Sequence, residues 1–279
     1  MLGKLIKYDM KSMVRVFAPV WILAPVVALL LSFTMRGAMV PSDYSLFSGT
    51  FENMTGLLTF VMSLMFFGVM VALVVMTVLL IVQRFWRGLL KEEGYLMFTL
   101  PVEPWKLITS KGITATIVCL ISGLVGILSC ILLFLGSTKG VMREFGQLWT
   151  FFLNNVNIEL GAALWVDLIL FILLMIAGAA KSIYQLYAAI AMGQLFQGHR
   201  IAGACVSYAG ISMVISFISG VCMLIVNMIV PDDWMYVFNS RADVFSVSYL
   251  MFLFLITVVQ IILFHVITER ILSTKLNLE

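Results

Sequence analysis

Residues 56–82 read GLLTFVMSLMFFGVMVALVVMTVLLIV, a run without one charged side chain. A helix needs about 20 apolar residues to cross the hydrocarbon of a bilayer. Inside that hydrocarbon every backbone amide must be hydrogen-bonded within a helix or a closed barrel. This run therefore predicts a membrane-spanning helix.

Five more runs of this kind occur in the chain, which has 279 residues and is 62% hydrophobic and 11% charged. Ordinary soluble domains are about 45–50% apolar and about 25% charged. Burying six such runs in a soluble core would need a far larger polar shell. The predicted fold class is an all-α membrane protein, a single transmembrane domain over 1–279 with spans at about 16–35, 56–82, 112–136, 161–180, 201–230 and 244–267.

Lysine and arginine are unequally divided between the two sides of these spans, and cytoplasmic loops carry the excess. Thirteen of the 17 fall on one side: Lys4, Lys7, Lys11, Arg15, Arg84, Arg87, Lys91, Lys106, Lys111, Lys181, Arg200, Arg270 and Lys275. The other side has Arg36, Lys139, Arg143 and Arg241. Both termini are therefore predicted to be cytoplasmic, in a multi-pass protein of the plasma membrane. Aromatic residues near the predicted outer boundary agree with this: Trp149, Trp165, Trp234 and Tyr236.

The first 15 residues have basic and apolar side chains at helical spacing. The basic residues are Lys4, Lys7, Lys11 and Arg15, opposite Leu2, Leu5, Ile6 and Met13. This pattern predicts an interfacial amphipathic helix over 1–15, lying along the inner membrane surface until Phe17 turns the chain into the bilayer. Such a helix is either a simple basic anchor or a collar that moves with the first span. That span is long for a signal peptide and is expected to be retained.

The longest predicted cytoplasmic loop, residues 83–111, reads QRFWRGLLKEEGYLMFTLPVEPWKLITSK and is more apolar than a solvated linker. A short helix over Lys91–Leu100 would end at Pro101, and Pro104 suits the first turn of the next helix. Contiguous exposed apolar surface usually marks an interface. The loop is therefore predicted to dock another protein, with a lipid-covered loop as the alternative.

A second unusual stretch, YAAIAMGQLFQGHR, covers residues 187–200 between the fourth and fifth spans. Lys181 either ends the fourth span or snorkels from a longer helix that continues toward Phe196. Small residues recur four apart on the fifth span and favour close helix packing: Gly203 and Ser207, then Ser212, Ser216 and Gly220.

Four stretches resemble the six-helix permease subunits of the ABC-2 class of ATP-binding-cassette transporters, particularly those of Gram-positive bacteria. They are MLGKLIKYDMKSMVRVF, EEGYLMFTLPVEPWKLITSK, AMGQLFQGHR and the closing KLNLE. Where that family often has a small hydroxyl residue after LPV, this chain has Glu103. Together the stretches cover about a fifth of the chain.

The resemblance implies a half-transporter for export, in which two permease subunits pair as a homodimer or heterodimer and each docks a separate cytoplasmic ATPase. The implied coupling helix contains Glu92, Glu93, Gly94, Tyr95, Leu96, Met97, Phe98 and Leu100. ATP would be bound and hydrolysed on the partner, with no cofactor or enzyme activity in this chain. In agreement, the only Gly-Lys pair, Gly3-Lys4, does not end a GxxxxGK[ST] phosphate-binding loop.

Polar residues inside a membrane are costly and are candidates for a substrate pathway: Asp167, Asn227 and Gln260. Asp167 is also close enough to the outer end of its span to reach water. The two amides could instead join helices by hydrogen bonds. His265, near Glu269 and Arg270, is expected at the inner interface.

Three other classes of function compete with the permease. A secondary transporter or channel without an ATPase would fit six spans, as would a membrane scaffold. An intramembrane protease is disfavoured, because Met97 stands where an EExxxR motif beginning at Glu92 needs Arg and neither histidine lies on a suitable span. The four cysteines make no metal-binding spacing, and the dispersed positive charge does not favour nucleic acid.

Overall fold

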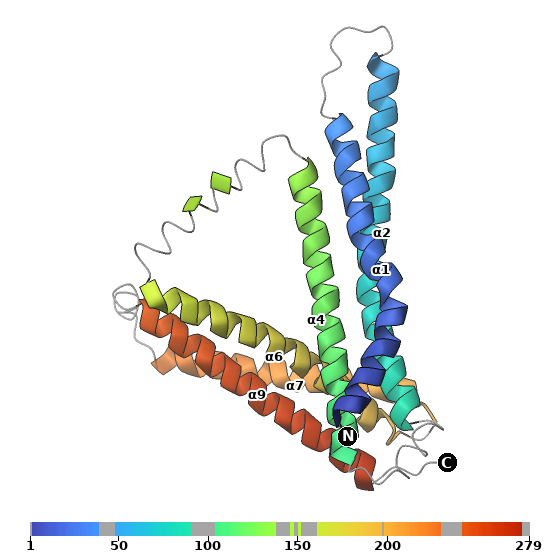
Figure 1. Cartoon of the computed structure of the whole chain (residues 1–279). Coiled ribbons are helices and arrows are strands. Elements are labelled where there is room, and N and C mark those ends of the chain that lie inside the picture. The colour runs from blue at the N-terminus through green and yellow to red at the C-terminus, as the bar shows by residue number, and fades with distance from the viewer. Residues whose placement is uncertain are drawn as a thin grey trace. The chain divides into compact units, whose positions relative to one another are not determined.

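The computed structural model of the chain describes residues 2–38, 48–90, 104–137, 146–147, 150–151, 161–196, 198–229 and 242–274. Six long helices make up nearly all of this part, and it contains no strand. They are α1 (Leu2–Ala38), α2 (Ser48–Leu90), α4 (Pro104–Ser137), α6 (Gly161–Gly193), α7 (Arg200–Ile229) and α9 (Ala242–Thr274), as Figure 1 shows. The predicted all-α fold class is confirmed for the described residues.

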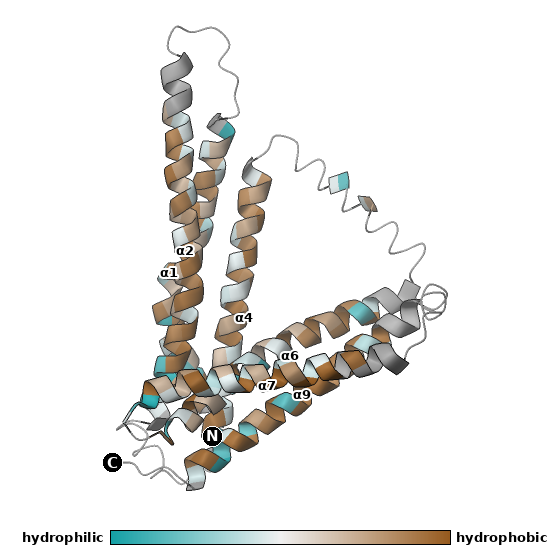
Figure 2. Cartoon of the chain, turned by 180° about the vertical axis from the view of Figure 1, so that it is seen from behind, coloured by the Kyte–Doolittle hydropathy of each residue, from teal (hydrophilic) through white to brown (hydrophobic). Residues whose placement is uncertain are grey.

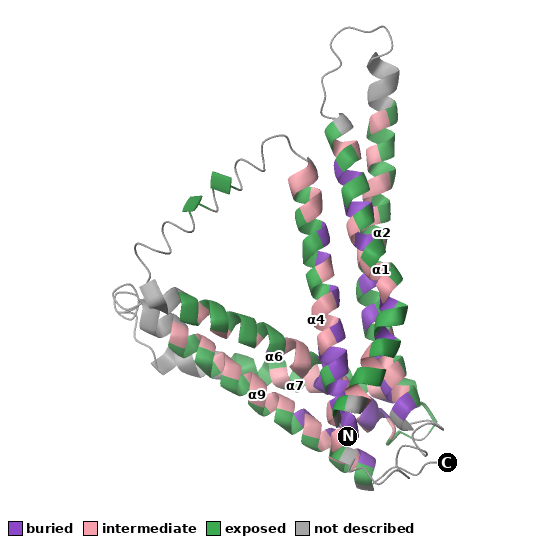
Figure 3. Ribbon diagram, viewed as in Figure 1, coloured by how far each residue is buried: buried purple, intermediate pink, exposed green. Residues whose placement is uncertain are grey.

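Each of the six helices is long and apolar enough to cross a membrane. The candidate spans are Leu5–Arg36, Met54–Gly88, Trp105–Gly136, Trp165–Gly193, Arg200–Val221 and Val247–Ser273. Hydrophobic side chains follow the helices over most of their length (Figure 2). Many of them are exposed in the isolated chain (Figure 3), as lipid-facing residues of a membrane protein must be. By length and composition the chain is a multi-pass membrane protein.

The structure gives the start of α4 and the end of α6, which the sequence alone suggested or left open. α4 begins at Pro104, as predicted, because proline lacks the amide hydrogen that the first helical turn leaves unused. α6 does not end at Lys181 but continues to Gly193. The reason lies in packing, since Ile183, Tyr187 and the residues that follow are buried against neighbouring helices.

The N-terminal residues differ from the predicted interfacial helix over 1–15. α1 runs as one helix from Leu2 to Ala38, and the chain does not turn at Phe17. Met13 and Phe17, one turn apart, are buried in a cluster with Val118 of α4. These two side chains therefore pack against protein, which favours one continuous helix over a bend onto the membrane surface.

The chain divides into two compact units. Unit 1 comprises Met1–Ile6, Val82–Thr116 and Val156–Glu279, and unit 2 comprises Lys7–Ile81 and Ile117–Asn155. In unit 1, α6 packs against both α7 and α9. Because α2 and α4 contribute residues to both units, the single domain over 1–279 stays a prediction.

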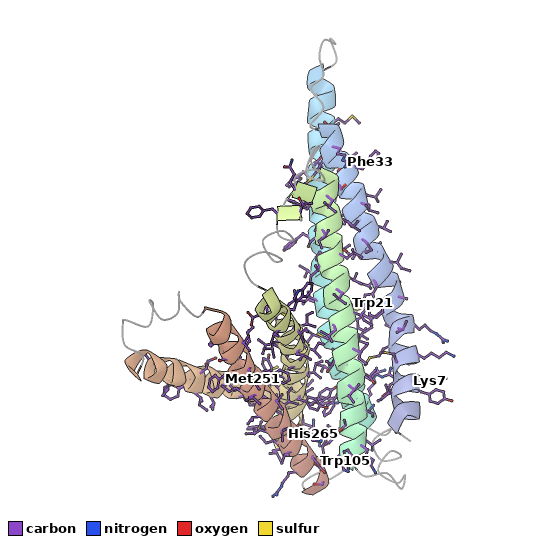
Figure 4. The ribbon with its side chains drawn as sticks, turned by 60° about the vertical axis from the view of Figure 1, so that its left-hand side comes forward. Lys7, Trp21, Phe33, Trp105, Met251 and His265 are labelled. Atoms are coloured by element: carbon purple, nitrogen blue, oxygen red, sulfur yellow. The ribbon has the colours of Figure 1, made fainter. Side chains whose placement is uncertain are left out.

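In unit 2, α1 and α4 are joined by polar contacts at two levels. The Trp21 indole donates a hydrogen bond to the Ser122 hydroxyl at 3.0 Å, and Figure 4 shows Trp21 between the two helices. Near the ends of both helices, the Arg36 guanidinium donates to the backbone carbonyls of Gly136 and of Leu135, the latter at 3.4 Å. The last carbonyls of a helix have no partner within it, so Arg36 caps α4.

Replacing Arg36 with Ala is expected to lower the free energy of unfolding by about 1 kcal/mol, because two carbonyls at the negative end of α4 lose a cationic donor. Arg36→Lys should keep part of the effect. The measurement is reversible denaturation in mixed micelles, with Arg87→Ala, an exposed arginine on α2, as the control. An unfolding free energy equal to that of the control variant would show that the cap contributes nothing.

Candidate functional site

A group of buried polar and aromatic side chains in unit 1 includes Lys111. This lysine lies in the second turn of α4 and is only 6% exposed. Tyr187 of α6 donates a hydrogen bond from its hydroxyl to the Lys111 backbone carbonyl at 3.3 Å. A buried cation inside a candidate span is costly and is by default a functional candidate. We call Phe85, Lys111, Tyr184, Tyr187 and His265 the Lys111 cluster.

Stacked rings hold the cluster together. Phe85, in the penultimate turn of α2, stacks on Tyr187 with ring centroids 4.0 Å apart and planes at 16°. Tyr184 meets Tyr187 edge-on at 6.1 Å and His265 edge-on at 5.5 Å. Figure 4 shows His265 on α9. Offset and edge-on pairs of this kind add about 0.5–1.5 kcal/mol each beyond burial, so the cluster connects α2, α4, α6 and α9.

Two glycines make room for the cluster. A side-chain carbon added at Gly88 of α2 would collide with the Lys111 ammonium. The same carbon would lie 3.1 Å from the Lys111 Cε. A carbon at Gly112 would lie 2.5 Å from the Tyr184 hydroxyl oxygen and 2.6 Å from its ring. At Gly112 the neighbour is an aromatic ring with little freedom to move, whereas at Gly88 it is the end of the flexible Lys111 side chain, which could shift.

The helix ends on both sides of residues 91–103 are buried within unit 1. Before the segment, Phe85 is buried on α2; after it, Leu107 and Ile108 are each 1% exposed on α4. All three lie in unit 1. The ends of α2 and α4 that flank the segment thus both lie in unit 1.

Of the site residues predicted from the sequence, the structure describes only part. The predicted coupling-helix residues, 92–98 and Leu100, lie outside the described residues. Asp167 is half-buried near the start of α6, and Asn227 belongs to the last turn of α7. Gln260 is half-buried on α9, and its carbonyl oxygen accepts no hydrogen bond from the described residues. Their role in a pathway stays a prediction.

Sequence reasoning missed the Lys111 cluster because it counted Lys111 only as one of many positive charges near a membrane boundary. His265 lies half-buried against Tyr184, and its place at the inner interface stays a prediction. Glycines at 88 and 112 and tyrosines at 184 and 187 were the available signals. None of them reveals a partner until the helices are placed.

The connection from α6 to α7 is a tight helical hairpin. Gly198 has a φ of 102°, a conformation that glycine adopts without strain. Gly193 lies against the backbone of Ala204, and Gly203 lies against the Phe196 ring. Farther along, the Gln185 amide donates to the Ser212 hydroxyl at 2.8 Å. Of the predicted small residues on the fifth span, Gly203 contacts the connection and Ser212 contacts α6, whereas Gly220 has nothing within 4 Å.

Within the described part of the chain, no group of three or more His, Cys, Asp or Glu side chains is placed to hold a metal ion. The Lys111 cluster combines one cation, hydroxyls and aromatic rings, which suits positioning of helices more than chemistry on a substrate. Compared with models of protein families, with curated proteins and with solved structures, the chain has no match.

Proposed function

We propose that this chain is the membrane-spanning permease subunit of an ATP-binding-cassette exporter. A separate ATPase subunit docks on the segment around residues 92–100, and a second permease subunit completes the transporter. One observation carries the proposal: the helices on either side of that apolar segment are both held in unit 1 by the Lys111 cluster and its neighbours Leu107 and Ile108. A docking element that drives transport needs attachments of this kind.

In this mechanism the ATPase supplies the work and this chain converts it into motion. Closure of two ATPases on ATP displaces the docking segments. Since Phe85 is stacked on Tyr187, the displacement reaches α6 rather than being absorbed at the end of α2. A change between two discrete packings of the helices then alternates access to the substrate, and Asp167, Asn227 and Gln260 are proposed to line the path.

The test is co-purification of the chain with an ATPase subunit encoded beside its gene. Replacing Glu92 and Glu93 with Lys is expected to reduce the co-purified ATPase at least tenfold. Two negative charges of the docking segment become positive, and the proposed complementary basic surface of the ATPase would then repel them. The matched control reverses Glu144 and Glu159, which the charge distribution predicts to lie on the opposite side of the membrane.

Loss of ATPase in both reversed pairs would indicate a general folding defect and would contradict docking at 92–100. Failure of the unmodified chain to bind the ATPase, with substrate uptake or release that needs no ATP, would replace the proposal with a secondary transporter or channel. Radioactive or fluorescent substrate flux in proteoliposomes, measured with and without ATP, distinguishes these outcomes.

A further inference from the structure

The N-terminal part of α1 carries three exposed cations on one side. Lys7, Lys11 and Arg15 are spaced four residues apart, so they follow one another along a single helical face. Figure 4 shows Lys7 pointing outward from α1. We call these three residues the basic stripe. No described carboxylate forms an ion pair with any of them.

The side of α1 opposite the basic stripe is packed against other helices, and this packing determines which way the stripe faces. Met13 is 5% exposed and Phe17 1% exposed, and both pack with Val118 of α4. Met10 and Leu80 of α2 pack against the same cluster. Because α1 cannot roll without opening this cluster, the stripe is held facing away from α2 and α4.

The depth of the stripe follows from helix geometry. The headgroup layer on each side of a bilayer is about 5–7 Å thick, and a helix rises about 1.5 Å per residue. If the hydrocarbon begins at residue 16, as the sequence predicts, Arg15 lies at its edge and Lys11 lies about 6 Å farther out. Lys7 lies about 12 Å out, in the water beyond the headgroup layer. The exposed Tyr8 ring lies beside the stripe.

We propose that the basic stripe binds the phosphate groups of anionic phospholipids and so fixes the height of α1 in the membrane. Lipid is the occupant that the depth favours, because a nucleic acid or an acidic protein approaching from water would have to displace the headgroups to reach Arg15. The charge is complementary, and the continuous α1 carries the stripe through the headgroup layer. This inference does not depend on the proposed ATPase partner.

The experiment uses the purified full chain in mixed micelles, titrated with phosphatidylglycerol, with phosphatidylcholine of the same chain length, or with inorganic phosphate. Bound lipid is counted by native mass spectrometry, and affinity is measured by thermal shift. Each cation near an anionic surface contributes about fivefold to binding. The triple variant K7Q/K11Q/R15Q is therefore expected to bind phosphatidylglycerol on the order of a hundredfold more weakly, and K7R/K11R/R15K is expected to retain binding.

The matched control removes three basic residues of other helices, with K181Q, R87Q and R200Q. It is expected to keep its preference for phosphatidylglycerol over phosphatidylcholine. If the control triple lost as much affinity for phosphatidylglycerol, the stripe would not be a specific site. Net charge alone would then explain the binding. An unchanged preference in the stripe variant would overturn the stripe as a specific site as well, and saturation by inorganic phosphate at the same concentration would point to a free anion rather than lipid. Lipid-free thermal unfolding of each variant identifies any that fails to fold.

Discussion

Replacing Tyr187 with Ala is expected to lower the free energy of unfolding by about 3–5 kcal/mol, the range for removing a fully buried aromatic ring. Tyr187 is 1% exposed and is among the largest fully buried side chains of the described residues. The change removes its stacking on Phe85 and its hydrogen bond to the Lys111 carbonyl. Denaturation in mixed micelles, followed by tryptophan fluorescence, measures the effect.

Two companion variants separate the contributions. Tyr187→Phe keeps the ring on Phe85 and loses only the hydrogen bond, so a cost of about 0.5–1.5 kcal/mol is expected. Tyr249→Ala removes a tyrosine that is 63% exposed on α9 and should cost almost nothing. If Tyr187→Ala proved no more destabilising than Tyr249→Ala, the Lys111 cluster would not be what joins α2 to α6.

Replacing Gly193 with Ala is expected to cost about 1–3 kcal/mol or more, because the added methyl overpacks a helix contact. Its carbon would lie 2.6 Å from the backbone nitrogen of Ala204 and 2.7 Å from its Cα. Gly193 has no positive φ, so the requirement for glycine is spatial. Backbone atoms cannot swing aside as a flexible side chain can, and α6 and α7 must separate. Thermal unfolding of the purified variant measures the cost.

The neighbouring Gly203 provides the contrast. The atoms nearest to a methyl there belong to the Phe196 side chain, at 2.7–3.0 Å, so Phe196→Ala should recover most of the stability lost by Gly203→Ala. Ala204→Gly should not rescue Gly193→Ala, since the obstructing nitrogen and Cα remain. If the second substitution restored stability at both Gly193 and Gly203, α6 and α7 would be packed less closely than the structure shows.

Both predictions concern α6, the helix on which unit 1 is built. α6 packs against α7 and α9 and, through Tyr187, against the ends of α2 and α4. A change in the tilt of α6 therefore alters several contacts at once. Under the proposed function, α6 would receive a displacement that begins at the docking segment.

The six apolar runs and their helical state were determined by the sequence alone, because an uncharged run of about 20 residues has one stable form in hydrocarbon. The start of α4 at Pro104 was equally local, since it depends on the missing amide hydrogen of one residue. The division of basic residues predicts an orientation for the same local reason, the cost of moving charge across a bilayer.

Only the tertiary structure decided where α6 ends, how α1 begins and which polar side chains meet. Lys181 could end a helix or continue one, and the burial of the residues beyond it favours continuation. The apolar face of residues 2–15 could lie on lipid or on protein, and Val118 of α4 decides in favour of protein for Met13 and Phe17. Lys111, Tyr187 and Phe85 are far apart along the chain, and such contacts arise only when helix surfaces fit together.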